Sequence, residues 1–289
     1  MKNRLFAIML GAVSACGLAN SSHADSQLLP GLSTGLALGY PLPEGVYDVT
    51  MPSYGWRNTN PATNVGVLVP AWLIWSTPWT FLGGGRLIFD TATGMADIDV
   101  NDVIHKQGVA NPYLDAQLKW SLGGGFFGGF QAGVYVPMED AVTPLGAAHN
   151  FATFQGTAAL TYLKDGWNLT STLIYGTGRS GSVAIPGSGA ADWLNVDLTA
   201  TKKFGKVEIG VVAFGSTDLS SPYAGYATQS QFAVGGLVGY HFNPVVLQLK
   251  LTRDVVEANY GGYETRLWAN LILPISEMMN SAAPVKAKD

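Results

Sequence analysis

The most constraining feature of this chain is a run in which apolar and polar residues alternate without a fault. From Leu114 to Leu122, every even-numbered residue is apolar and every odd-numbered residue is polar. Successive side chains of a strand point to opposite faces, so this run predicts a strand with one apolar and one polar face. Gly123–Gly125 follows and can adopt the positive φ angles of a tight turn. The return segment places Phe126, Phe130 and Val134 on one face, which predicts a β-hairpin.

Segments of this kind recur along the chain. We expect about twelve strands, each near or above the roughly 9–11 residues that a tilted strand needs to cross a bilayer. The predicted strands are residues 44–54, 64–75, 79–90, 113–122, 126–137, 151–163, 167–178, 192–203, 206–217, 229–242, 245–255 and 262–274.

The connections between these strands alternate between tight turns and longer loops. The five tight turns are residues 76–78, 123–125, 164–166, 204–205 and 243–244, and the six longer loops are residues 55–63, 91–112, 138–150, 179–191, 218–228 and 256–261. Bacterial outer-membrane barrels have short periplasmic turns and longer outer loops. The chain is therefore predicted to be all-β: a transmembrane antiparallel barrel in the outer membrane of a Gram-negative bacterium, with lipid against its apolar faces.

Aromatic residues gather near the ends of the predicted strands, as in the two aromatic girdles of a membrane barrel. The alternative is that strands favour aromatic residues in general. Near the tight turns are Trp75, Trp79, Trp120, Phe126, Tyr162, Trp167, Phe204, Tyr240 and Phe242, and near the longer loops are Trp56, Phe89, Tyr135, Phe151, Tyr175, Trp193, Phe214 and Tyr263.

The first 24 residues resemble a secretory signal peptide. Lys2 and Arg4 precede an apolar run, and Ser22–Ala24 is a small-x-small cleavage signal before Asp25. A lipoprotein signal ending at Cys16 is a rival interpretation. We expect residues 1–24 to be a signal peptide, 25–43 a periplasmic or lumenal segment, 44–275 the barrel and 276–289 a periplasmic tail.

Charge and cysteine content exclude several classes of protein. Charged residues make up 12% of the chain, about half the usual share of a soluble domain. Without Lys2 and Arg4 the net charge becomes 14 − 20 = −6, which argues against nucleic acid as a partner. Cys16 is the only cysteine, so we expect no disulfide and no cysteine metal site in the mature chain.

Three motifs point to alternatives to the barrel. No charge occurs between Arg57 and Arg86, which would allow a transmembrane helix, but Pro70, Pro78 and the run Gly83–Gly85 disfavour it. Two G-x-G-x-x-G sequences, at residues 123–128 and 176–181, do not open a helix, so no cofactor is expected. Residues 97–102 begin like a calcium loop but lack its glycine and final glutamate, which favours a solvated acidic loop over the alternative of a loose surface cation site, and no metal site is predicted.

Charged residues on the polar faces of the strands are the candidate site residues. By alternation they face the lumen, where they could line a solute path or pair with one another to fill the interior. A lipid-facing Arg or Lys at the midplane would cost about 2–4 kcal/mol. The candidate lumen-lining residues are Arg86, Asp115, Lys119, Asp197, Glu208, Lys250, Glu264 and Arg266.

The sequence does not favour an enzyme. His105 and His149 lie in predicted long loops, whereas His241 lies by a tight turn at the opposite rim. A hydrolase would need a nucleophile, a base and an orienting group within hydrogen-bond reach. A barrel hydrolase stays the less favoured alternative, and no catalytic residue is predicted.

Short motifs resemble a known family. They are similar to motifs of the outer-membrane barrels named for the meta-pathway of phenol degradation. The motifs are Leu42–Tyr47 with Pro52–Tyr54, the spacing from Gly108 through Asn111-Pro112 to Asp115, Tyr135–Pro137 and the end strand from Arg266 to Pro274. The segment Ala110-Asn111-Pro112 is less glycine-rich than is usual there. The resemblance implies a transporter for aromatic or other hydrophobic compounds and carries over no binding residue.

The function expected from these observations is passive passage of small hydrophobic or aromatic solutes. The loop residues Tyr223, Tyr226 and Tyr260 could catch a ring-shaped solute, and residues 25–43 could obstruct a narrow lumen. The alternative is a non-conducting structural or adhesive barrel. The sequence leaves the solute and the oligomeric state open.

Overall fold

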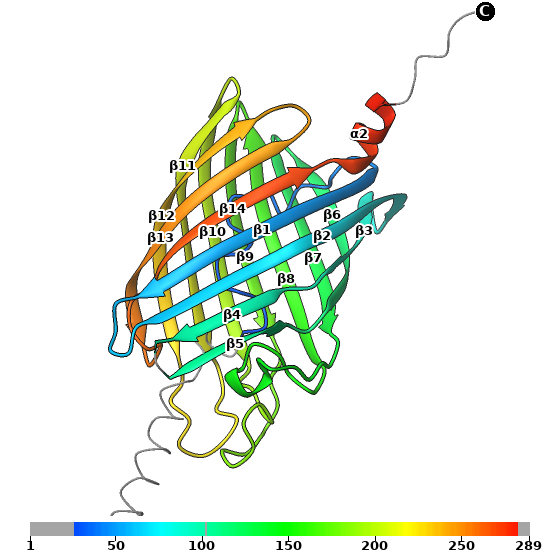
Figure 1. Cartoon of the computed structure of the whole chain (residues 1–289). Coiled ribbons are helices and arrows are strands. Elements are labelled where there is room, and N and C mark those ends of the chain that lie inside the picture. Colours follow the sequence, from blue (N-terminus) through cyan, green and yellow to red (C-terminus); the bar gives the residue numbers. More distant parts are fainter. Residues whose placement is uncertain (1–25, 102, 283–289) are drawn as a thin grey trace, which may run out of the picture.

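The described residues form a closed antiparallel barrel of twelve strands, and a hairpin of two further strands extends the sheet at one place, which confirms the predicted fold (Figure 1). The structure is a computed structural model that describes residues 26–101 and 103–282. Strands β1 and β14 pair with each other and close the sheet. The strands are β1 (Gly45–Arg57), β2 (Thr63–Phe81), β3 (Gly85–Ala92), β4 (Met95–Val100), β5 (Ile104–Val109), β6 (Tyr113–Gly123), β7 (Phe126–Tyr135), β8 (Thr153–Lys164), β9 (Trp167–Gly176), β10 (Trp193–Phe204), β11 (Val207–Asp218), β12 (Ser230–His241), β13 (Val246–Ala258) and β14 (Thr265–Leu273).

The predicted alternation holds in the hairpin formed by β6 and β7. Asp115, Gln117 and Lys119 are buried, whereas Leu114 is exposed. In β7, Phe130 is 65% exposed and its neighbour Gln131 only 7%. The apolar faces therefore form the outer surface of the barrel, where lipid would lie, and the polar faces enclose the interior.

The prediction of a loop over residues 91–112 was wrong, because this region contains β4 and β5. Strand β4 pairs with the first part of β2, and β5 pairs with β4, so the two strands extend the wall beyond β3 and β6. Ile98 is buried, whereas Asp97 is exposed. The acidic face therefore points outward, the opposite polarity to the lipid-facing strands, as expected for a hairpin that rises above the membrane into water. The predicted solvated acidic loop is therefore a strand over residues 97–100, and its acidic face is the exposed one.

The first predicted tight turn was also misplaced. Ser76 and Thr77 are fully buried within β2, and the pairing of β2 with β3 shifts register between Ser76 and Thr80. The turn instead lies at residues 82–84, where Gly83 and Gly84 adopt φ angles of 81° and 92°. Pro78 falls within the irregular stretch, where a missing N–H breaks no regular ladder.

The transmembrane-helix alternative for residues 58–85 was wrong, since β2 occupies most of that stretch. Among residues 26–101 and 103–282, no helix is long and apolar enough to span a bilayer. This described part of the chain contains a 3₁₀ turn η1 (Thr143–Leu145) and helix α2 (Ile275–Ala282), which follows β14 where a tail was predicted. The signal peptide and the lipoprotein site at Cys16 lie outside the described residues.

The aromatic prediction was partly wrong. Trp79 and Phe204 are exposed on the outer surface, as an interfacial girdle requires. Trp75 and Phe89, which were predicted to lie in opposite girdles, are directly opposite each other on β2 and β3, because the turn after β2 lies at residues 82–84. Four aromatic residues assigned to the outer girdle are instead buried: Tyr135, Phe151, Trp193 and Phe214.

A cavity between an inner segment and the barrel wall

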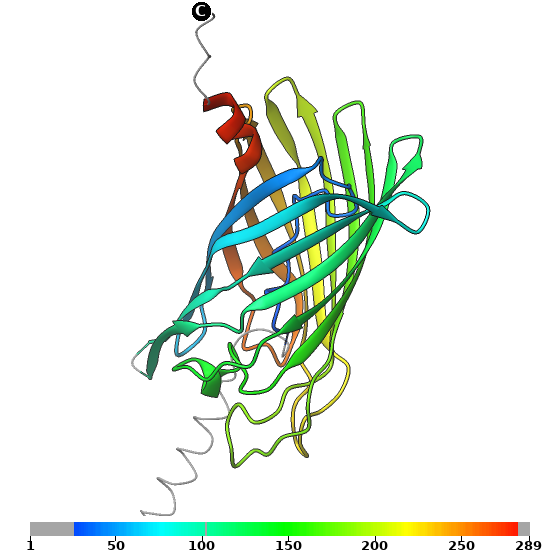
Figure 2. The same ribbon diagram turned by 90° about the vertical axis from the view of Figure 1, so that its right-hand side faces the viewer.

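Residues 26–43, here called the inner segment, run through the barrel from the end with the long loops to the end with the tight turns and α2 (Figures 1 and 2). Near its start, the Gln27 side-chain nitrogen lies 2.7 Å from His149 Nδ1 in an outer loop. Near its end, the Leu42 carbonyl accepts a hydrogen bond from Ser76 at the other end of the barrel. The inner segment thus occupies much of the lumen.

Two of the predicted lumen residues hold the inner segment in place. The Asp197 carboxylate accepts hydrogen bonds from the amides of Gly31 and Ser33, at 3.0 and 3.1 Å, and from the Ser33 hydroxyl at 2.7 Å. The Lys250 ammonium donates to the carbonyl and hydroxyl oxygens of Thr34, both at 2.9 Å. Both groups are buried, so these charge-assisted bonds replace the water that the charges lose.

Neutral side chains from several strands complete the attachment. The Gly35 amide donates to Thr199, and the Gly39 amide donates to Thr161. The Gly35 carbonyl accepts from Gln248 at 3.1 Å. Because seven strands contribute partners, the inner segment is bound by the barrel as a whole and not by one wall. Those strands are β1, β2, β8, β9, β10, β13 and β14.

Two further predicted residues form an ion network near the outer end. Arg266 binds Glu264 through two nitrogens, at 2.7 and 3.1 Å, and Arg57 contacts the same carboxylate at 3.2 Å. The backbone amide of Glu264 donates to Asp254. Tyr260 packs on Arg57, 5.0 Å from ring centroid to guanidinium carbon, and is buried. The expectation that Tyr260 catches solute from an exposed loop was therefore wrong.

The remaining predicted residues lie apart from these groups. Asp115 and Lys119 lie on β6, with Asp90 directly opposite Asp115 on β3. Glu208 lies near the tight turns and accepts from Gln248 at 3.1 Å. Arg86 is the one of the eight that is only partly buried. The structure therefore distributes the candidates along the interior and does not assemble them into one site.

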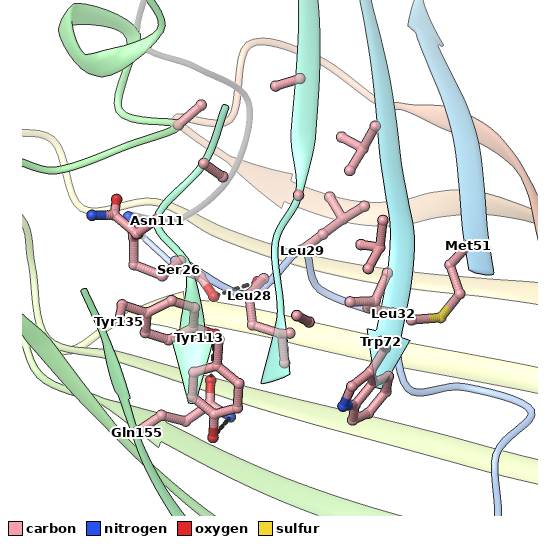
Figure 3. Close-up of a pocket in the computed structure, with 18 of the residues that line it drawn as sticks. Ser26, Leu28, Leu29, Leu32, Met51, Trp72, Asn111, Tyr113, Tyr135 and Gln155 are labelled. Carbon is pink, nitrogen blue, oxygen red and sulfur yellow. Dashed lines mark hydrogen bonds between the residues drawn. The ribbon is translucent and has the colours of Figure 1, made fainter. Parts of the chain in front are cut away.

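An apolar cavity of about 130 Å³ lies between the inner segment and the barrel wall. An engineered cavity of similar size, about 150 Å³, in another protein is dry and binds benzene, so this space suits a single aromatic ring. Figure 3 shows Leu29, Leu32 and Met51 on one side of the cavity and Tyr113 and Tyr135 on another. Its apolar walls come from Leu28, Leu29 and Leu32 of the inner segment, Val65, Val67 and Val69 of β2, and Met95, Ala96 and Ile98 of β4.

One wall of this cavity carries a chain of hydrogen-bonded polar side chains. The Tyr135 hydroxyl donates to Gln155 Oε1 at 2.8 Å, and Gln155 Nε2 donates to the Tyr113 hydroxyl at 3.1 Å. Tyr113 in turn donates to Asp115 at 3.2 Å, and Gln117 Nε2 donates to Asp115 at 3.0 Å. The cavity is therefore apolar on one side and polar on the other.

A second, larger cavity of about 680 Å³ lies toward the tight turns. It shares Leu38 and Trp72 with the first cavity, and its other lining residues include Lys119 and Glu208. The two cavities follow one another along the barrel, with Leu38 and Trp72 between them. A solute that crossed the barrel by this route would pass these two side chains.

The outer loop at residues 138–150 covers the first cavity. Val142 and Leu145 pack against Val65 and Ile98 in an apolar cluster. His149 is buried, and burial lowers its pKa to about 4, so the ring is neutral at pH 7. Its backbone carbonyl accepts from Asn111 at 2.7 Å. The loop is thus fastened both to the wall and to the inner segment.

The histidines weighed for a hydrolase do not meet. His105 lies 2.9 Å from Asp97 on the exposed hairpin of β4 and β5, and His241 lies 3.2 Å from Glu208 near the tight turns. Among the other loop tyrosines, the Tyr226 hydroxyl donates to Asp218 at 2.7 Å. The predicted capture of a ring by Tyr223 and Tyr226 in the outer loops stays a prediction.

Sequence reasoning missed most of the cavity wall. Tyr113 has the same strand parity as Asp115, so counting alternate residues would have placed it inside the barrel. Tyr135 lies near a strand end, which predicts a girdle position, and Gln131 and Gln155 carry no charge to distinguish them from other polar strand residues. The inner segment carried no periodic signal.

Comparisons with known proteins agree with the fold. The model of the family described as "Putative MetA-pathway of phenol degradation" matches residues 71–271. An outer membrane channel from Pseudomonas putida F1 is similar in structure, with a TM-score of 0.63, 15% identity, and coverage of 80% of this chain and 96% of that chain. The NanC porin has a TM-score of 0.49 and 9% identity over 78% of this chain and 98% of that chain. No curated protein sequence matches the chain. Since the family model spans well over half of the residues, the chain belongs to the phenol-degradation family that its motifs resemble.

Proposed function

We propose that the protein is a passive outer-membrane channel for small apolar solutes, with single-ring aromatic compounds as the preferred class. The observation that carries the proposal is the ring-sized apolar cavity inside a barrel of the outer-membrane type. The family description, which refers to phenol degradation, supports the same solute class.

The path that we propose uses both cavities. A solute would enter under the loop at residues 138–150, occupy the first cavity and pass Leu38 and Trp72 into the larger space near the tight turns. Such a path requires the inner segment to shift, since it forms one wall of both cavities.

A structural barrel without conduction is the second candidate. It is favoured by the pairing of Glu264 with Arg266 and by the attachment of the inner segment to Asp197 and Lys250. In that case the interior charges fill the lumen and do not line a path.

Growth of a deletion strain on a panel of aromatic carbon sources at low concentration tests the channel. We expect the strain to grow more slowly than its parent on at least one of these compounds, and the wild-type gene to restore growth. Ala96→Phe, which fills the cavity, should fail to restore it, whereas Ala116→Phe on the exposed face of β6 should succeed. Equal growth of deletion strain and parent on every compound would favour the structural barrel.

A further inference from the structure

We propose that Gln131 and Gln117 recognise the oxygen of an uncharged, hydroxyl-bearing aromatic solute. The inference rests on the proposed function and narrows its solute class. Gln131 lines the first cavity, and Gln117 lines the second. The two residues lie directly opposite each other on β7 and β6, at the junction between the cavities.

The two glutamines present one free donor and one free acceptor. Within residues 26–101 and 103–282, Gln131 Nε2 and Gln117 Oε1 are buried and have no hydrogen-bond partner. A buried amide group without a partner loses the hydrogen bonds it made to water, a cost of about 1–3 kcal/mol. A hydroxyl group can accept from Gln131 and donate to Gln117, so one solute group would satisfy both.

The groups beyond Gln117 explain why the solute should be uncharged. Gln117 Nε2 is already engaged by Asp90 and Asp115, which lie opposite each other on neighbouring strands. Two carboxyl groups near one buried lysine, Lys119, give this wall no excess of positive charge. A carboxylate solute would be desolvated beside two acidic groups, and the nearby cation, Lys119, already interacts with both of them, which makes the carboxylate unfavourable here.

The rest of the cavity limits the size and polarity of the solute. The facing walls are Leu, Val, Met and Ile side chains, and the volume of about 130 Å³ fits one ring. An aromatic ring would thus contact the apolar walls while its hydroxyl group reached the two glutamines. If a water molecule instead bridged the two glutamines permanently, the cavity would not prefer rings that carry a hydroxyl group.

Calorimetric titration of the protein in lipid nanodiscs, with empty nanodiscs as the blank, tests this inference. The probes at pH 7 are toluene, benzyl alcohol, benzoate and benzylamine, which differ in one substituent. We expect benzyl alcohol to bind about tenfold more tightly than toluene, because one or two hydrogen bonds are gained in the apolar cavity. Benzoate and benzylamine should bind more weakly than benzyl alcohol, because each brings a charge into the apolar cavity and an ammonium group cannot accept a hydrogen bond from Gln131.

A matched pair of variants assigns the preference to Gln131. Gln131→Leu should weaken benzyl alcohol binding about tenfold and leave toluene binding unchanged. Gln231→Leu is the control, because Gln231 is equally buried, at 7% exposed, but does not line this cavity. Heat-dependent migration of both variants in detergent gels checks that they fold.

The outcomes separate the inference from the proposed function. If toluene and benzyl alcohol bind equally, or if benzoate or benzylamine binds most tightly, the role of the glutamines is refuted while the apolar cavity stands. The comparison of the four probes on the wild-type protein decides this even if a variant fails to fold. If no probe binds, toluene included, the proposed function fails as well.

Discussion

Ser33 donates two hydrogen bonds to the carboxylate of Asp197, one from its backbone amide at 3.1 Å and one from its hydroxyl at 2.7 Å. The two residues are 164 positions apart in the sequence. This contact, with the bonds from Lys250 to Thr34, fixes the inner segment across the lumen. Whether the proposed channel is open or obstructed therefore depends on the strength of the hydrogen bonds that attach the inner segment to Asp197 and Lys250.

Replacing Asp197 should loosen the inner segment. Asp197→Ala removes three hydrogen bonds to a charged group and leaves Lys250 buried without this carboxylate, a loss of at least about 2 kcal/mol. Such a loss raises the population of released segments roughly thirtyfold. Planar-bilayer recordings should show more frequent openings for this variant than for the wild type. Asp99→Asn, on the outer hairpin, is the control, and equally silent traces for Asp197→Ala would refute the anchoring role.

Acidification should loosen the outer loop through His149. Burial lowers its folded pKa to about 4 from an ordinary value of 6.5, so the unfolded loop binds the proton first as pH falls. The stability of the closed loop is fully present above pH 6.5 and declines by about 3 kcal/mol as pH falls to 4. Hydrogen exchange of residues 138–150, corrected for the intrinsic pH effect, should rise over this range.

The variant His149→Gln distinguishes loop opening caused by protonation of His149 from nonspecific destabilisation of the protein by acid. It cannot be protonated, so exchange in the loop should lose most of its pH dependence. His105→Gln, at the exposed hairpin, should behave like the wild type. The same pH profile in His149→Gln and wild type would show that another group is responsible.

A methyl group added at Gly133 should disturb the polar wall of the cavity. A Cβ atom there would overlap the hydroxyl group and ring of Tyr113, which would have to move away from Asp115 and Gln155. We expect Gly133→Ala to reduce the free energy of unfolding by about 1–3 kcal/mol, as for other overpacked sites. Gly156→Ala on β8 meets no atom within 4 Å and should cost little. Urea unfolding of both variants in vesicles measures the difference, and equal losses would argue against the packing of Tyr113 over Gly133.

Removing Glu264 should destabilise the outer end of the barrel. Arg57 and Arg266 both bind its carboxylate and are almost fully buried, at 3% and 1% exposed. Breaking such a buried network by removing one partner costs about 3–5 kcal/mol. Glu264→Ala should therefore unfold at a clearly lower urea concentration, while Glu139→Ala at an exposed position should not. An unchanged midpoint would mean that the network contributes nothing to stability.

The barrel could be predicted from the sequence because lipid imposes a simple alternation on each strand. The pattern around Asp115 and Lys119 gave both the strand and its buried face. The same rule failed at β4, where Ile98 points inward and Asp97 outward into water above the membrane. A rule that assigns apolar residues to the lipid-facing side cannot assign the faces of a strand that lies outside the bilayer, because its outer face contacts water.

The site was harder to predict because its walls come from distant parts of the chain. The cavity exists only where Leu29 and Leu32 of the inner segment face Tyr113 and Gln155 of two separate strands. Neither the contact of Ser33 with Asp197 nor the pairing of Gln117 with Gln131 leaves a local pattern. Strand parity places Gln131 inside the barrel, but only the structure shows that its amide nitrogen lacks a partner among the described residues.

The most direct test of the central claim is the planar-bilayer conductance of the protein with residues 26–43 deleted, compared with the wild type. If the barrel encloses a path that the inner segment obstructs, the deletion should convert a nearly closed channel into one with a steady, readily measured ion conductance. A folded deletion variant that conducts no better than the wild type would contradict the claim that this barrel is a channel.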